Sequence, residues 1–184
     1  MHKVNLNYFT FIEDFNKETI KKLDRKIILI FRNYKRDINK QMLSQLKDYC
    51  KKNKRKILLS NNIRLAKILD FDGIYLPSFN KKLVDYTLGT KKNFIIMGSA
   101  HTKAEINIKI KQKVDLIVLS PIFKVNKKRN YLNISRFNIL ANNTKKGVIA
   151  LGGINHSNIK KLQMLNINGF ASITFFKKKY NILN

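Results

Sequence analysis

The chain has 184 residues, enough for one domain with a core, and 44% of them are hydrophobic, which excludes an intrinsically disordered chain. No run of about 18 apolar residues occurs, and the residues after Met1 lack the apolar core of a signal peptide, so neither a membrane-spanning helix nor a secreted protein is expected. The single Cys50 cannot form an internal disulfide, so we expect a cytoplasmic protein in which Cys50 is an ordinary helix residue.

The formal charge of +27 gives a field that attracts nucleic acid, anionic membranes and phosphorylated ligands. The lysines are spread along the whole chain, which is the pattern of a compositional bias such as that of an AT-rich genome. A nucleic-acid binder concentrates its charge among aromatic residues, and the densest basic run here, residues 51–56, is interpreted as a helix end and loop. We therefore expect a small-molecule ligand and no membrane partner, with nucleic-acid binding as the disfavoured alternative.

Short β-branched or aromatic runs recur along the chain, separated by amphipathic, lysine-rich segments. Because most of these runs do not alternate apolar and polar residues, they indicate strands that are buried on both faces. The predicted strands are residues 8–12, 27–31, 57–59, 73–76, 94–97, 116–119, 148–151 and 170–173.

Helices are predicted between these strands at residues 38–49, 63–69 and 157–165, the last with Ser157 as its cap. Alternation of strands and helices over residues 1–184 predicts one α/β domain, a compact parallel (β/α)₈ TIM-type barrel. Eight units leave roughly 23 residues each, less than such barrels usually have, so some helices must be short or missing. An open doubly wound sheet is the alternative architecture.

Polar or glycine-containing segments follow most of the predicted strands. In a parallel barrel the loops after the strands meet at one rim, where binding and catalytic sites are built. We therefore predict a ligand site at this rim, formed by residues 32–35, 60–62, 77–78, 98–102, 120–123, 152–155 and 172–174.

Two of these segments predict a phosphate site. Gly152 and Gly153 allow the backbone to approach a ligand closely, and the 172–174 turn lies beside them in a barrel. A tight strand-to-helix turn alone explains the glycine pair equally well.

His101, at a strand end, is predicted to face the ligand and move a proton, although an isolated histidine is often only a hydrogen-bonded surface residue. Acidic residues at strand ends are too few for a metal cage, so no metal site is predicted.

Five segments, taken in order and spacing, resemble the thiamine-phosphate synthase and TenI (thiazole tautomerase) family from about residue 27 to residue 173. They are residues 62–66, 72–76, 98–102, 120–123 with Lys128 beyond, and 150–154. The resemblance implies a (β/α)₈ barrel that binds a thiazole phosphate, with the phosphate beside Gly152 on Gly153, Ser172 and Ile173. It further implies that Arg32, Lys35, Ser99 and Lys128 hold a pyrophosphate or carboxylate.

The chain departs from the synthase pattern where that pattern carries metal-binding carboxylates. Ser60-Asn61 and residues 77–80, which end in Asn80, stand at those two places. Neutral amides hold Mg²⁺ poorly, so no cofactor is expected unless synthase activity is retained. The TenI branch shifts a proton without a metal, and its histidine corresponds to His101. TenI-like proton transfer is therefore favoured, with thiamine-phosphate synthase or a non-catalytic phosphate-binding barrel as alternatives. A homo-oligomer, in which a partner subunit replaces missing helices, is left open.

Overall fold

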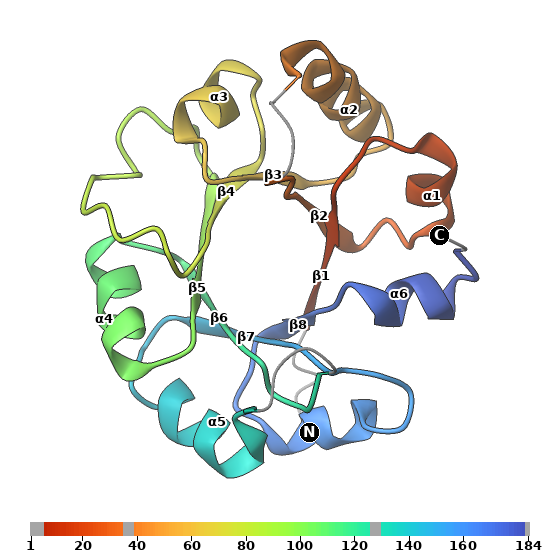
Figure 1. Ribbon diagram of the computed structural model, residues 1–184. Coiled ribbons are helices and arrows are strands. Elements are labelled where there is room, and N and C mark those ends of the chain that lie inside the picture. Colours follow the sequence, from red (N-terminus) through yellow and green to blue (C-terminus); the bar gives the residue numbers. More distant parts are fainter. Residues whose placement is uncertain (1–5, 35–38, 126–129, 183–184) are drawn as a thin grey trace.

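The computed structural model describes residues 6–34, 39–125 and 130–182 and shows a closed barrel of eight parallel strands in sequence order (Figure 1). The predicted (β/α)₈ fold is confirmed, and the open sheet is wrong because β8 pairs with β1, with Asn7 opposite Gly169. The strands are β1 Asn7–Ile12, β2 Ile27–Phe31, β3 Ile57–Ser60, β4 Gly73–Leu76, β5 Ile95–Ala100, β6 Leu116–Leu119, β7 Gly147–Leu151 and β8 Gly169–Ala171.

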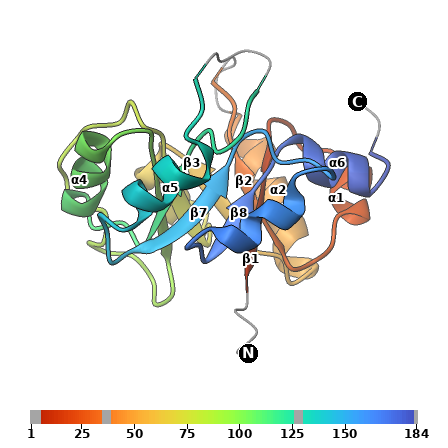
Figure 2. The ribbon, with the colours of Figure 1, turned by 90° about the horizontal axis from the view of Figure 1, so that it is seen from below.

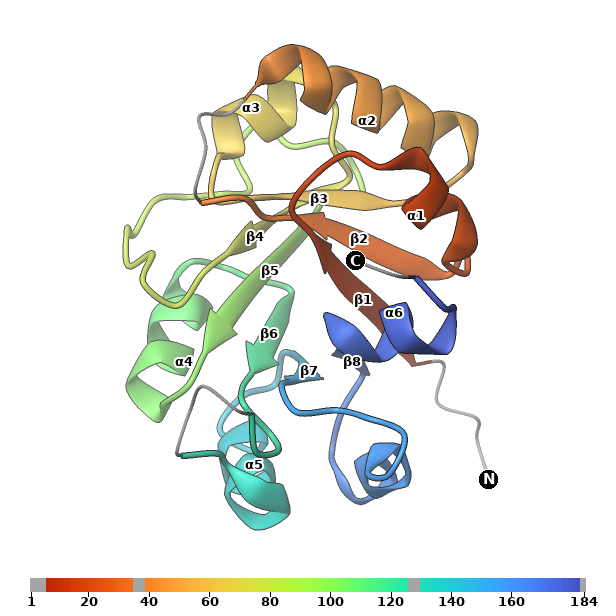
Figure 3. The ribbon, with the colours of Figure 1, turned by 45° about the vertical axis from the view of Figure 1, so that its right-hand side comes forward.

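The helices outside the barrel are short, as the length of the chain requires. They are α1 Lys17–Lys22, α2 Lys40–Lys52, α3 Ile63–Ile68, α4 Lys103–Lys111, α5 Asn133–Ala141 and α6 Thr174–Lys179, with a 3₁₀ helix at Ile159–Met164. Figures 1 and 3 show α2 and α3 side by side along the outside of β2, β3 and β4. The connection from β4 to β5, whose residues are all described, contains no helix. No helix in the described ranges is both long and apolar enough to span a membrane.

Asparagine and threonine side chains begin four of these helices. Asn16, Asn39, Asn62 and Thr102 each accept a hydrogen bond from the backbone N–H three residues later, which satisfies a donor at the first turn. The prediction that Ser157 caps a helix is wrong. Its segment forms the 3₁₀ helix after position 158 without a side-chain cap, and the N–H and hydroxyl of Ser157 instead donate to the Asn155 side chain.

The apolar residues form two clusters because each strand has one face inside the barrel and one face toward the helices. Every strand contributes to the interior cluster, as expected for a barrel filled by side chains. Its buried members are Phe9, Phe11, Ile30, Leu58, Tyr75, Met97, Val118, Ile149 and Ala171. The larger second cluster lies between the strands and the helices and includes Leu29, Leu46 and Phe137. Burial on both faces explains why the strands read as continuous apolar runs.

Polar side chains fasten neighbouring strands at the end of the barrel where the strands begin. Asp72, Asp115 and Asn168 directly precede β4, β6 and β8, and each accepts a backbone N–H near the start of the preceding strand at 2.8–3.0 Å. Three neighbouring strand pairs are therefore fixed in register by a side chain as well as by the sheet.

The densest basic run is a helix end and loop, as predicted. Helix α2 ends at Lys52 and β3 begins at Ile57. Arg55 within it is buried and turned inward, where its guanidinium donates to the carbonyl oxygens of Leu23 and Asp24 at 2.8 and 2.7 Å. Arg55 therefore stabilises the α1–β2 connection and presents no charge to a surface partner.

Candidate functional site

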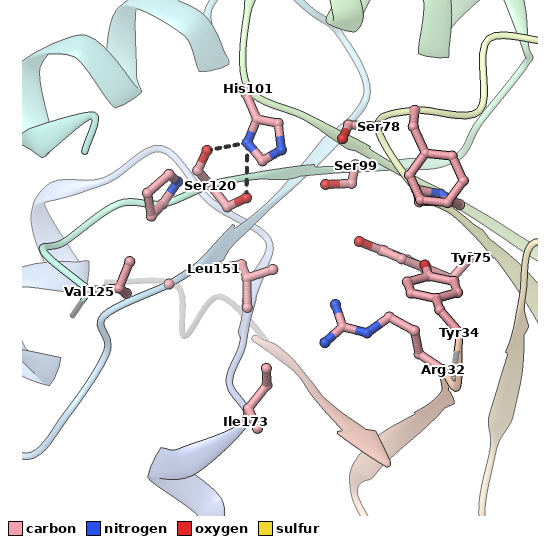
Figure 4. Close-up of a pocket in the computed structure, with 14 residues that line it drawn as sticks. Arg32, Tyr34, Tyr75, Ser78, Ser99, His101, Ser120, Val125, Leu151 and Ile173 are labelled. Carbon is pink, nitrogen blue, oxygen red and sulfur yellow. Dashed lines mark hydrogen bonds between the residues drawn. The ribbon is translucent and has the colours of Figure 1, made fainter. Parts of the chain in front are cut away.

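The site follows from the alternation of side chains along the strands. Because residues i and i+2 of a strand face the same side, the residue two places beyond an interior core residue also faces the barrel axis, one layer nearer the carboxyl ends. At six strands this next residue lines a cavity of about 310 Å³ (Figure 4). These six residues are Arg32, Pro77, Ser99, Ser120, Leu151 and Ile173.

The cavity lies at the end where the connections after the strands gather. Figure 2 shows the described parts of the β2–α2 and β6–α5 connections at the same end of the barrel, opposite the end where the chain enters β1. The other lining residues are Tyr34, Tyr75, Ser78, Phe79, His101, Pro121, Val125 and Gly152. Among these described lining residues there is an arginine and no carboxylate. The lining therefore suits an anionic ligand.

His101 is held at the end of β5 by the first turn of α4. Thr102 accepts the backbone N–H of Glu105 at 3.2 Å, and the Glu105 carboxylate accepts the backbone N–H of His101 at 2.6 Å. This reciprocal arrangement is the capping pattern of Ser or Thr followed three residues later by Glu, shifted here by one position. It fixes the backbone from which the imidazole enters the cavity.

The imidazole of His101 has a defined tautomer. Its Nδ1 lies 2.6 Å from the carbonyl oxygen and 3.3 Å from the Oγ of Ser120. A carbonyl oxygen only accepts, so Nδ1 carries the hydrogen and, in the neutral ring, Nε2 keeps its lone pair. In Figure 4 that second nitrogen lies on the side of the ring away from Ser120. His101 can therefore take a proton from a ligand in the cavity at Nε2.

Arg32, Tyr75 and Ser99 occupy another side of the cavity (Figure 4). The Arg32 guanidinium stacks on Phe11 at 4.4 Å from the ring centroid, which holds it at the cavity wall. Burial raises the pKa of the Tyr75 phenol, while Ser99 and Arg32 act in the opposite direction. The phenol therefore remains protonated at neutral pH. Arg32 and Ile173 also line a neighbouring cavity of about 440 Å³ beside α1 and α6.

The glycine pair is shaped by the loop after β6. Gly152 and Gly153 have φ values of 101° and 72°, a region that glycine enters without strain. A Cβ on Gly153 would lie 2.6 Å from the carbonyl oxygen of Phe123, and one on Gly152 would lie 2.7 Å from Pro121. Gly152 lines the cavity, whereas Gly153 lies behind it against that loop. Close packing therefore requires both glycines whether or not a phosphate binds there.

The side chains of the two predicted site residues after β8, Ser172 and Ile173, lie on different sides of the strand. Ile173 lines the cavity. Ser172 is buried, and its Oγ accepts the backbone N–H of Phe175 at 3.0 Å at the start of α6. Alternation explains the difference, because the residue after interior Ala171 faces outward. The backbone N–H groups of Gly153 and Ile173 donate to no other group among the described residues, so a phosphate oxygen could accept from them.

Two predicted site residues, Lys35 and Lys128, lie outside the described residues. The structure in turn adds Tyr34, Tyr75 and Ser120, to which the sequence alone assigned no role of their own. The signal that identifies Ser120 is its distance of two positions from interior Val118.

The two positions that lack carboxylates meet in the structure. The Asn80 side-chain amide donates to Asn61 Oδ1 at 2.7 Å, and Tyr86 donates to Asn80 Oδ1 at 3.3 Å. Mg²⁺ favours carboxylate oxygens and water molecules as ligands over side-chain amides that are already hydrogen-bonded to each other. Over the described ranges no three His, Cys, Asp or Glu side chains gather where they could hold a metal ion. The side chains at these positions do not fit a magnesium site.

Comparison with known proteins identifies the family. The family model TMP-TENI, described as thiamine monophosphate synthase, matches residues 17–176. Thiamine-phosphate synthases of Bacteroides thetaiotaomicron and Dictyoglomus turgidum are 26% and 27% identical over 69% and 75% of this chain. The matched regions cover 65% and 63% of those two relatives, so the chain spans about two thirds of their length.

The fold has a counterpart among solved structures. Thiamine phosphate pyrophosphorylase from Pyrococcus furiosus superposes with a TM-score of 0.72 and 15% identity, covering 93% of this chain and 86% of that one. At that identity the superposition supports the fold. The family model, by contrast, matches nearly the whole chain, and the protein belongs to the thiamine-phosphate synthase/TenI family.

Proposed function

We propose that the protein acts in thiamine biosynthesis on a thiazole phosphate, and that it moves a proton within a thiazole carboxylate phosphate without a metal, as TenI-type proteins do. The observation that carries the proposal is the hydrogen bond from His101 Nδ1 to the Ser120 carbonyl oxygen, which leaves Nε2 as a base in the cavity. A fixed tautomer directed at a ligand is what general acid–base catalysis requires.

In this proposal His101 Nε2 accepts a proton from one atom of the bound thiazole and returns it to another, so the ligand and the enzyme end with the protons they began with. The imidazolium formed in between keeps its Nδ1 hydrogen bond to Ser120. The Arg32 guanidinium, in a cavity whose described lining residues include no carboxylate, binds the carboxylate or phosphate of the ligand. The buried Tyr75 phenol, which stays protonated, supplies a neutral hydrogen-bond donor.

Thiamine-phosphate synthase activity is the second candidate, favoured by the description of the family model and by the names of the relatives. That reaction joins a pyrimidine diphosphate to the thiazole phosphate and expels pyrophosphate, whose charge Mg²⁺ helps to bind. The direct hydrogen bond between Asn61 and Asn80 weighs against it in this chain, because two amides bonded to each other are poor ligands for Mg²⁺.

Two assays separate the candidates. In the first, the thiazole carboxylate phosphate tautomer is incubated with the protein in D₂O, and NMR follows isomerisation and deuterium incorporation with and without EDTA. We expect turnover that EDTA does not change. In the second, pyrimidine diphosphate and thiazole phosphate are mixed with the protein in a single turnover with Mg²⁺ or with EDTA.

Thiamine phosphate formed only with Mg²⁺, together with an inactive first assay, would establish the synthase and refute the tautomerase. Binding of the thiazole phosphate without turnover in either assay would leave the non-catalytic phosphate-binding barrel. No binding of a thiazole phosphate would refute all three.

A further inference from the structure

Two aromatic rings stand exposed at the mouth of the cavity. Tyr34 and Phe79 are 53% and 62% exposed, yet both line the cavity. Neither belongs to the two apolar clusters that hold the barrel and its helices together. Other apolar side chains of the described residues are equally exposed, but these two rings also line the cavity, so a ligand that enters it would cover them.

The Tyr34 ring and the backbone that carries Phe79 are both held in place. Tyr34 Oη lies 3.1 Å from Ser60 Oγ at the end of β3. The backbone on either side of Phe79 is held by buried Lys109. Its ammonium donates to the carbonyl oxygens of Pro77 at 2.9 Å and Asn80 at 2.7 Å. An anchored ring loses little conformational freedom when a ligand binds, so it contributes more to affinity than a mobile one.

The two rings contact each other edge to face. Their centroids are 5.7 Å apart and their planes meet at 69°. In such a pair the edge of one ring rests on the face of the other, so the two rings present surfaces of different orientation to a third ring. The Arg32 guanidinium lies 5.9 Å from the Tyr34 ring centroid, which places a cation beside this aromatic surface.

We infer that Tyr34 and Phe79 form the surface that packs against the thiazole ring of the ligand, and that they select a heteroaromatic phosphate over a simple alkyl phosphate. The inference rests on the proposed function, since it assigns a subsite for the same ligand. Arg32 and the backbone N–H groups of Gly153 and Ile173 bind the anionic groups, and the aromatic pair binds the ring. Affinity for the anion and selectivity for the ring thus come from different residues.

The test compares two ligands on three variants by calorimetry. The ligands are 4-methyl-5-(2-hydroxyethyl)thiazole phosphate and ethyl phosphate, which share the phosphate and differ in the ring. The variants are Phe79→Leu and Tyr34→Leu, which keep an apolar side chain and lose the ring, and Leu88→Ala as the matched control. Leu88 is 67% exposed on the same β4–β5 connection and does not line the cavity.

We expect Phe79→Leu and Tyr34→Leu each to weaken thiazole phosphate binding about 3- to 10-fold, the range for an aromatic contact, without changing the affinity for ethyl phosphate. Leu88→Ala should change neither. Equal weakening of both ligands, or no weakening of the thiazole ligand, would overturn the inference and leave the proposed function standing. Failure of the unmodified protein to bind the thiazole ligand would overturn the proposed function and the inference with it.

Discussion

The buried ammonium of Lys109 predicts an unusual dependence of stability on pH. Its side chain is fully buried, and its Nζ donates to the carbonyl oxygens of Pro77 and Asn80 and to Gln112 Oε1, all neutral acceptors. Burial lowers the pKa of Lys109 from the ordinary 10.5 to about 8, with the charge of Glu105 acting in the opposite direction. The unfolded chain therefore keeps this proton to a higher pH than the folded chain does.

The sign of the effect follows from proton linkage. Between the folded pKa of about 8 and the unfolded value of 10.5, the unfolded state binds more protons, so the free energy of unfolding rises with pH. From pH 7 to pH 9.5 this single group should add about 2 kcal/mol. The other titrating groups are shared by the unmodified protein and its variants, so a comparison between them isolates the effect of Lys109.

The assay is urea unfolding followed by circular dichroism at pH 7, 8, 8.75 and 9.5. Lys109→Met removes the titrating group and should flatten the curve by about 2 kcal/mol over this window relative to the unmodified protein. Lys111→Met, an exposed change on the same helix, should run parallel to the unmodified protein. If Lys109→Met also runs parallel, the ammonium is not held at a depressed pKa and the reasoning is refuted. Should Lys109→Met fail to fold, Lys109→Arg gives the same comparison, because a guanidinium does not titrate there.

Three further predictions concern the site and the core. His101→Asn should abolish thiazole tautomerase turnover while calorimetry still detects ligand binding; full activity would refute the acid–base role. Gly153→Ala should weaken binding of the thiazole phosphate at least about 10-fold, because its Cβ would displace the Phe123 carbonyl. Gly89→Ala, also at positive φ but with only the Lys67 ammonium nitrogen near its Cβ, at 3.7 Å, should leave affinity unchanged, and equal affinities of the two variants would remove Gly153 from the site. Burial raises the pKa of the Cys50 thiol to about 11, so a disulfide reagent should label it only in urea, and rapid labelling of the folded protein would contradict this burial.

The fold was predictable because burial on both faces leaves a strong mark on the sequence. The runs at residues 27–31, 73–76 and 116–119 match β2, β4 and β6 residue for residue. The ends of other elements were less predictable, because a strand can continue past its apolar run into residues that the sequence pattern assigns to a loop. Strand β5 runs on through Gly98 and Ser99 to Ala100, whereas β8 stops at Ala171, before the predicted end.

The location of the site, at the rim where the strands end, was predictable from the sequence. Which side chains line it was less predictable. Placing polar segments after strands leads to Arg32, Ser99 and His101, all of which line the cavity. Whether a residue faces inward depends on which face of each strand closes around the axis, and no short segment reveals that. Family resemblance therefore assigns Ser172 to the phosphate, although its hydroxyl oxygen accepts the backbone N–H of Phe175 in the first turn of α6. The roles of Lys35 and Lys128, the oligomeric state and the cytoplasmic location stay predictions.

The asparagines that cap helices, and Asn168, which links two neighbouring strands, suggest how the charge of this chain could be lowered without disturbing its fold. Asn16, Asn39, Asn62 and Asn168 each accept a backbone N–H through the side-chain oxygen, a role that aspartate fills equally well. Asp72 and Asp115 already do so at positions equivalent to that of Asn168. Aspartate at the three caps would also interact favourably with the helix dipoles. Redesign can thus lower the positive charge of the chain position by position, at places where a backbone N–H already donates to a side-chain oxygen.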